Sequence, residues 1–132
     1  MTAAGGFEVS PLGGLPLFSA GMAIAPAVLE ALGAGGLRDG DIVVLAQKIV
    51  SKSEGRLVAL ADVTPGEEAR ALAAKTGREP AMAQLILDEA HAILRANPAA
   101  IIARHKTGHV LANAGIDASN VEGGEGGTVL LW

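Results

Sequence analysis

Two lysines and two serines lie close together in a short polar segment, Gln47 to Gly55. The segment directly follows Ile42 to Leu45, a continuous apolar run typical of a strand buried on both faces. Ligands commonly bind beyond such strand ends in open α/β sheets. In extended backbone Lys48 and Lys52 point the same way, where two ammonium groups suit a polyphosphate. The alternative is a solvated edge strand whose lysines oppose aggregation, and composition alone favours that alternative.

A second candidate lies downstream, where a carboxylate and an amide stand three positions apart. Asp117 and Asn120 belong to the segment Ala114 to Val121. Within a turn the two side chains can converge, so that the carboxylate holds a hard cation and the amide bonds a phosphate or a base. The alternative is an Asx-turn or a helix cap, and these residues unaided favour it.

The loop Gly13 to Leu17 is a third candidate, because its glycines carry no side chain. Backbone N–H groups beside glycine can approach a ligand closely, although most such loops are turns alone. The chain contains neither a G-x-x-x-x-G-K-[ST] phosphate loop nor a dinucleotide fingerprint after a strand. A nucleotide site in this chain must therefore be built differently.

Two histidines, His105 and His109, have a spacing that occurs in some metal sites. They flank a predicted hairpin turn with no third ligand nearby, so the sequence favours a structural role for both. His91 stands alone on a predicted helix and carries still less signal.

Three helices are expected, one in the first third of the chain and two in succession from Pro65 onward. The first runs from Pro26 to Leu32 and ends at Gly33. The second starts at Pro65, because Thr64 and Glu67 match a capping box, and it reaches about Lys75. Another helix follows from about Pro80 to Arg95, with apolar residues on one stripe at helical spacing.

Strands are expected between and after these helices, at apolar runs bounded by turn residues. Two of the runs flank a short polar connection, which is the pattern of a hairpin. The helices and strands together predict one domain of the α/β class, of mixed α+β type. The predicted strands are Phe7–Val9, Ile42–Leu45, Arg56–Leu60, the hairpin pair Ala100–Ala103 and His109–Ala112, and Thr128–Trp132.

Composition argues against several function classes. A net charge of -4, with ten Lys and Arg spread along the chain, provides no basic face for nucleic acid. Two Phe, one Trp and no Tyr leave few platforms for stacking bases. The absence of cysteine excludes disulfides and thiolate sites and is compatible with a reducing cytoplasm. No run approaches the roughly 18 apolar residues of a membrane span, so no membrane partner is expected.

Four segments together resemble the F420-0:gamma-glutamyl ligase family in order and spacing. They are Gly14-Leu15-Pro16, Gly40 to Leu45, Gln47 to Gly55 and Asn113 to Val121. The run Gln-Lys-Ile-Val-Ser-Lys-x-Glu-Gly is specific to that family when paired with Asn-Ala-Gly-Ile-Asp-x-Ser-Asn-Val downstream. The resemblance covers essentially the whole chain and reverses the preference for the structural alternatives at both segments.

The resemblance implies a GTP site built from these segments. Lys52 would contact phosphate, with Lys48 as a neighbour, and Asp117 would bind a divalent metal. Gln47 falls where relatives carry a hydroxyl residue and is placed at the same site. The residues implied to bind GTP are Leu15, Pro16, Leu17, Phe18, Gln47, Lys52 and Asn120.

The implied reaction is GTP-dependent ligation of L-glutamate to the coenzyme F420 precursor F420-0, through an acyl-phosphate. The resemblance also implies Mg2+ or Mn2+, K+, a homodimer and a mixed sheet with flanking helices. Family members continue beyond Trp132 and supply an adjacent Asp-Thr pair there, so this chain is expected to hold half a site and to be inactive alone.

A competing hypothesis is a non-catalytic nucleotide-binding or assembly module from a truncated copy. An exposed apolar strand at Thr128–Trp132 would favour it, because an unpaired edge invites a partner. The ligase hypothesis instead requires Lys52 and Asp117 to face a common cavity.

Overall fold

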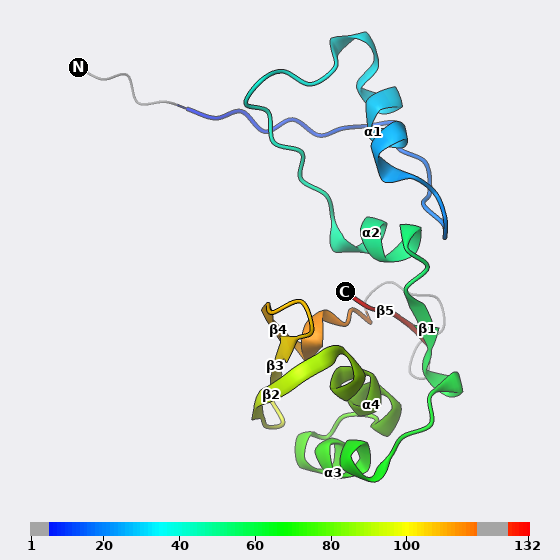
Figure 1. Ribbon diagram of the computed structural model, residues 1–132, viewed down its shortest axis with the longest axis vertical. Helices are drawn as coiled ribbons and strands as arrows, with labels where there is room; N and C mark the ends of the chain where they lie inside the picture. Colours follow the sequence, from blue (N-terminus) through cyan, green and yellow to red (C-terminus); the bar gives the residue numbers. More distant parts are fainter. Residues whose placement is uncertain (1–5, 119–126) are drawn as a thin grey trace, which may run out of the picture.

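The computed structural model describes residues 6–118 and 127–132, which form an elongated molecule (Figure 1). Its helices and strands confirm the α+β class. In those residues the strands pair antiparallel, as a two-stranded and a three-stranded sheet and not as one mixed sheet. The N-terminal third, with helix α1, stands apart from the sheets in Figure 1, and helix α2 joins the two regions. No helix in the described ranges is long and apolar enough to cross a bilayer.

Helix α1, Ile24–Leu32, confirms the predicted first helix and starts two residues before Pro26. It ends at Gly33, whose φ of 61° is readily adopted by glycine and whose N–H bonds back to Glu30 and Leu29. A single 3-10 turn, Gly33–Gly35, follows. Val28 is the one buried residue of α1, so this helix packs little surface against the rest of the described chain.

Two predicted strands, Phe7–Val9 and Ile42–Leu45, are not strands in the structure. Phe7 is 92% exposed, and Ile42 and Val44 are 86% and 87% exposed. An apolar β-branched run signals that a segment can be buried in a sheet, but a strand also needs a neighbouring edge. Within residues 6–118 and 127–132 no strand pairs with either run.

Helix α2, Gln47–Ser53, replaces the extended segment predicted there. Ala46 is still extended, and the backbone then makes about two helical turns before Gly55, where φ is 67°. Lys52 lies in the last turn, where a cation is favoured by the helix dipole. Alternating polarity in this short segment was compatible with either structure, and docking against the C-terminal strand decides for the helix.

Strand β1, Leu57–Ala59, pairs antiparallel with strand β5, Thr128–Leu130. Both strands were predicted. Val129 and Leu130 are each 1% exposed, and Leu131 is also buried. The terminal apolar run is thus a paired, buried strand and not an open edge, which removes the observation that would have favoured an assembly module.

Helix α3, Glu67–Thr76, confirms the predicted second helix, and Gly77 ends it in the left-handed conformation. The predicted capping box is wrong, because Gly66 is the N-cap and no side chain caps the helix. The N–H of Gly66 instead donates to the side-chain oxygen of Gln84 on the next helix. A 3-10 turn, Leu60–Asp62, connects β1 to this region.

Helix α4, Pro80–Glu89, starts where predicted but ends six residues earlier than Arg95. Strand β2, Ala90–Ala96, follows without a loop and pairs with β3. The apolar residues beyond Glu89 fit a helical stripe and a strand almost equally well over so few residues. Pairing with the hairpin strand overrides the helical period there.

Strands β3, Ile101–His105, and β4, Val110–Ala112, form the predicted hairpin, and Gly108 in its turn has φ 93°. A 3-10 turn, Asn113–Gly115, then leads to Asp117, which forms an isolated bridge with Leu130 of β5. The main core lies between α4, β3 and β5. Its buried residues are Leu60, Ala81, Leu85, Ile86, Ile101, Ala103, Ala114, Ile116, Val129 and Leu131.

Candidate functional site

A hollow of about 160 Å³ lies between helix α2 and the first loop of the chain. The loop contributes four consecutive residues, and the helix contributes two lysines and an isoleucine. All four loop residues predicted to line a nucleotide pocket are therefore found around one cavity with Lys52. The lining residues are Leu15, Pro16, Leu17, Phe18, Lys48, Ile49 and Lys52.

Lys48 and Lys52 share this hollow because they lie four residues apart on a helix. Residues at that spacing are neighbours on one helix face. The expected extended backbone is wrong here, because the segment is helical, and both lysines nevertheless reach the same cavity. Two cations beside an apolar loop suit a ligand with a polyphosphate and an apolar or aromatic part.

Asp117 lies next to this cavity without lining it. Lys48 Nζ is 3.3 Å from Asp117 Oδ2, and the two side chains are 33% and 27% exposed. The backbone of Asp117 is fixed by a hydrogen bond to Leu130 O and by another from Leu130 N, each 2.9 Å long. Lys48 thus lies between the hollow and the carboxylate. The ligase hypothesis requires Lys52 and Asp117 to face one cavity, and of these two residues only Lys52 lines it.

Gln47 is turned toward the segment that precedes Asp117. Its Nε2 donates a 2.9 Å hydrogen bond to the carbonyl oxygen of Gly115. This bond uses one donor of the side-chain amide and leaves the second donor and the oxygen for another partner. The predicted contact between Gln47 and GTP stays a prediction, and the structural contact with Gly115 was not expected from the sequence.

The turn that presents Asp117 carries backbone strain that no sequence pattern indicated. Asn113 and Ala114 have φ values of 50° and 53°, in the left-handed region that non-glycine residues rarely adopt. Asn113 Oδ1 is buried without a hydrogen-bond partner in the part of the chain described. Strained turns of this kind concentrate at ligand sites. Asn120, the predicted partner of Asp117, lies outside the described residues.

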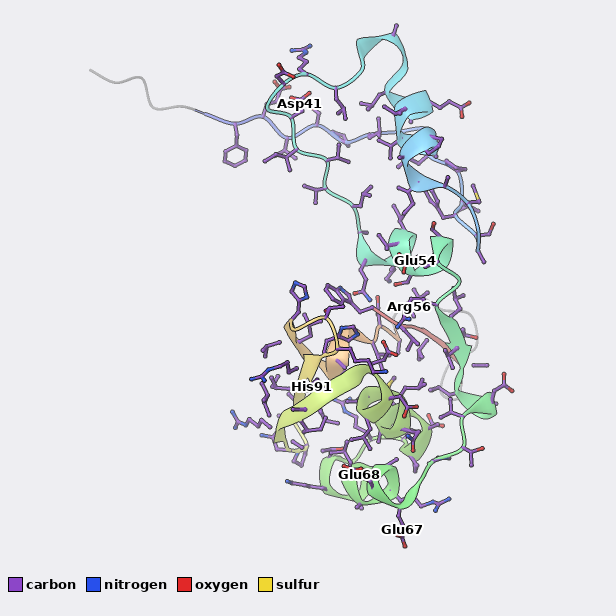
Figure 2. All side chains as sticks on the ribbon, viewed as in Figure 1. Asp41, Glu54, Arg56, Glu67, Glu68 and His91 are labelled. Atoms are coloured by element: carbon purple, nitrogen blue, oxygen red, sulfur yellow. The ribbon has the colours of Figure 1, made fainter. Side chains whose placement is uncertain are left out.

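The two histidines of the hairpin belong to a polar cluster that no sequence pattern indicated. Glu89, at the end of α4, accepts from Arg56 and lies 3.2 Å from Nε2 of His105, which is 3% exposed. Thr107 Oγ1 is 2.9 Å from a ring nitrogen of each histidine. Figure 2 labels Arg56 where the chain passes from α2 into β1. The cluster ties the hairpin to that passage.

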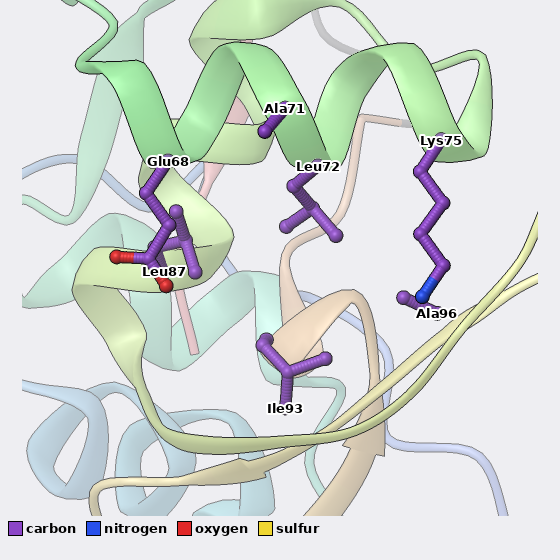
Figure 3. A pocket seen from close by; sticks show the side chains of 7 residues that line it. All are labelled: Glu68, Ala71, Leu72, Lys75, Leu87, Ile93 and Ala96. Atoms are coloured by element: carbon purple, nitrogen blue, oxygen red, sulfur yellow. The ribbon is translucent and has the colours of Figure 1, made fainter.

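A larger hollow, of about 280 Å³, lies between α3, α4 and β2. Figure 3 shows Leu72 of α3 and Ile93 of β2 pointing toward one another across it. Glu68 and Lys75 stand at its rim. Its floor is aliphatic and no predicted site residue reaches it, so charge and motif both favour the smaller hollow beside α2.

A divalent cation fits the chemistry of Asp117 only in part. In the described ranges, no three His, Asp or Glu side chains converge on one point. Mg2+ is commonly held by one or two carboxylates together with substrate phosphates, and Asp117 already carries the ammonium of Lys48 as a neighbouring cation. The residues present fit a metal ion shared with a phosphorylated ligand.

Comparison with known proteins finds a matching family. The model of the family F420-0:Gamma-glutamyl ligase matches residues 14–132. The chain is 42% identical over 121 residues to a coenzyme F420:L-glutamate ligase of Methanothermobacter thermautotrophicus, covering 90% of this chain and 48% of that protein. A protein of the same name from Methanosarcina mazei is 37% identical over 118 residues, covering 89% and 45%. The chain thus spans about half the length of these curated relatives.

Proposed function

Because the chain belongs to the F420-0:gamma-glutamyl ligase family, we propose that its protein joins L-glutamate to F420-0 with GTP as the phosphoryl donor. The supporting observation is the shared hollow, where the loop Leu15–Phe18 meets Lys48 and Lys52 beside Asp117. The family match gives the class of reaction. The hollow gives the place where we put the nucleotide.

We place the base and sugar of GTP against the loop and the phosphates over the lysines. The loop side chains are apolar, and Leu17 is 95% exposed, so a planar ring lying on them would bury surface that now faces water. Lys52 would meet the phosphates as a flexible point charge. Gln47 and Asn120 complete the set of proposed nucleotide contacts.

A divalent ion would be held by Asp117 and the phosphates, and Mg2+ or Mn2+ suits such an oxygen ligand set. When bound, it would neutralise charge on the phosphates during transfer. Lys48 now neutralises Asp117 at 3.3 Å. Lys48 also lines the hollow, so its ammonium would lie within reach of both the carboxylate and the phosphates.

In the proposed reaction an oxygen of the F420-0 carboxylate attacks the γ-phosphorus of GTP. The bond from that phosphorus to the bridging oxygen breaks, and GDP leaves with the electron pair. The glutamate amine then attacks the acyl carbon and inorganic phosphate leaves. The nitrogen, counted from its ammonium form, gives two protons to water and keeps one as the amide N–H. A second round would add a γ-linked glutamate. Fixed positive charge is the main contribution expected from the protein in such chemistry.

Potassium, a homodimer and a cytoplasmic location complete the proposal. The first two rest on the family resemblance alone. The location rests on the absence of cysteine, which suits a reducing compartment.

The experiment traces the carboxylate oxygen that the acyl-phosphate route would transfer to inorganic phosphate. Full-length protein is incubated with GTP, Mn2+, glutamate and F420-0 whose reacting carboxylate carries ¹⁸O. We expect a product heavier by one or two glutamyl residues and one ¹⁸O atom in the released inorganic phosphate. Product without label in phosphate would exclude the acyl-phosphate route and keep the ligase. Hydrolysis of GTP with no heavier product would contradict the proposed activity.

A further inference from the structure

Helix α2 contacts the C-terminal segment through a face next to its two lysines. Gln47 and Ser51 lie four residues apart on that face, as Lys48 and Lys52 do on theirs. Gln47 Nε2 donates to Gly115 O at 2.9 Å, and Ser51 Oγ donates to Leu131 O at 2.6 Å. Two side chains of one helix thus bond two backbone carbonyls that are far from it in sequence.

These two carbonyls stand on either side of Asp117 in the fold. Gly115 precedes Asp117 by two residues, and Leu131 follows Leu130, the residue that exchanges two backbone hydrogen bonds with Asp117. Hydrogen bonds from α2 therefore hold the chain segments on both sides of Asp117. The 3.3 Å contact between Lys48 and Asp117 depends on these bonds.

Ser51 is the stronger of the two contacts. It is 2% exposed, and its hydrogen bond is buried. A buried hydrogen bond from a hydroxyl adds little net stability. Removing the Ser51 hydroxyl, however, deprives the carbonyl oxygen of Leu131 of this bond and destabilises the fold. Packing alone would be served by an aliphatic residue here, since Val129, Leu130 and Leu131 make this region of the core apolar.

We propose that Ser51, assisted by Gln47, is a positioning residue that sets the lysines of α2 against Asp117. The proposal rests on the proposed function for its consequence, which is that the two hydrogen bonds keep the metal-binding carboxylate and the phosphate-binding ammonium groups at one spacing. Ser51 touches neither ligand. It acts through Leu131 and Leu130 on one side and through the helix on the other.

Ser53 provides a matched control on the same helix. Its Oγ also donates to a backbone carbonyl, that of Met22, which belongs to the segment between the first loop and α1. Ser51→Ala and Ser53→Ala therefore make the same chemical change two residues apart, on nearly opposite faces of α2. Ser51→Ala removes the hydrogen bond to the C-terminal segment that supports Asp117. Ser53→Ala removes the hydrogen bond to the segment that follows the first loop.

The binding experiment measures the dissociation constant of GTP with Mn2+ and again with EDTA, by calorimetry on the full-length protein. For Ser51→Ala we expect the tightening caused by Mn2+ to fall about tenfold, as for changes behind a metal ligand, with the metal-free constant unchanged. For Ser53→Ala we expect the metal-free constant to weaken and the tightening by Mn2+ to persist. Equal tightening in Ser51→Ala and the parent protein overturns the proposal.

A second measurement needs no ligand. Hydrogen exchange of the Asp117 and Leu130 amides, which bond each other's carbonyls, reports how firmly the carboxylate segment is held. We expect about fivefold faster exchange in Ser51→Ala and in Gln47→Met, and no change in Ser53→Ala. Unchanged exchange overturns the positioning role even where GTP binds. A parent protein that binds no GTP, with faster exchange in Ser51→Ala, overturns the proposed function and leaves the positioning role standing.

Discussion

At the scale of single residues, the carboxylate of Asp117 and the ammonium of Lys48 form the centre of the proposed site. Each is about one-third exposed, so water screens their attraction and the pair contributes little to stability. A contact of that kind is easily exchanged for another partner. This exchangeability is what a site needs if the same carboxylate is to receive a metal ion when a phosphorylated ligand arrives.

Replacing Asp117 tests that exchange. In Asp117→Asn the amide keeps the shape of the side chain but loses the charge that attracts a cation. We expect the tightening of GTP binding by Mn2+ to fall about tenfold or more, while binding in EDTA is kept. Calorimetry in both buffers measures the two constants. Full tightening by Mn2+ in the variant would remove Asp117 from the metal site.

Replacing Lys52 tests the phosphate contact. Lys52→Met retains the apolar stem and removes a charge that lines the hollow, so we expect GTP to bind about tenfold more weakly and with a smaller dependence on salt. Lys75→Met is the control, because Lys75 lines the hollow on α3 instead. Titrations at two salt concentrations compare the variants. Equal losses in both would indicate a general charge effect and no contact at α2.

At the scale of elements, the sequence predicted α1, α3, β1, β5 and the hairpin, because helix-ending glycines, turns and apolar periods there agree with one another. It failed at α2 and at the end of α4, where a few residues fit two periods and distant strands decide between them. For the site, the family resemblance pointed to the loop and Lys52, which line one hollow, and to Asp117, which contacts Lys48 beside it. Their roles in binding stay predictions. The hydrogen bonds from Gln47 and Ser51 join residues far apart in the chain, so no local sequence pattern could predict them.

The turn before Asp117 gives a stability test at this scale. Gly115 has φ 79°, and a Cβ there would lie 2.7 Å from Cβ of Trp132. Gly108 has φ 93° with open space around it. We expect Gly108→Ala to cost about 1–2 kcal/mol from backbone strain, and Gly115→Ala to cost about 1–3 kcal/mol more from the clash. Urea unfolding measures both, and equal costs would contradict the packing of Trp132 on this turn.

At the scale of the whole molecule, one polar cluster connects the hairpin to the passage between α2 and β1. Glu89 bonds Arg56 and His105, and the backbone carbonyl of Arg56 accepts from Leu131. The C-terminal strand that supports Asp117 is thereby tied to the three-stranded sheet. The His105 and His109 rings lie edge-on to Trp132, with centroids 5.2 and 4.7 Å from it, and cover the end of that strand.

Breaking this cluster should loosen the strand. Glu89→Gln keeps the shape of the side chain and removes the carboxylate charge that faces both Arg56 and His105. We expect the unfolding free energy to fall by about 1–3 kcal/mol. Glu68→Gln, on the exposed face of α3, should change it by less than about 0.5 kcal/mol. Thermal unfolding of the two variants under one condition makes the comparison. Equal unfolding free energies for Glu89→Gln and Glu68→Gln would show that the charge of Glu89 contributes no more to stability than an exposed surface charge.

The central claim is that metal and nucleotide meet beside α2, and paramagnetic broadening by Mn2+ in the presence of GTP tests it most directly. In amide NMR spectra we expect the signals of Lys48, Lys52 and Asp117 to broaden first, because relaxation by Mn2+ falls steeply with distance. Signals of Leu72 and Leu87, which line the hollow between α3 and β2, should stay sharp. Broadening at Leu72 and Leu87 with sharp signals at Asp117 would contradict the claim.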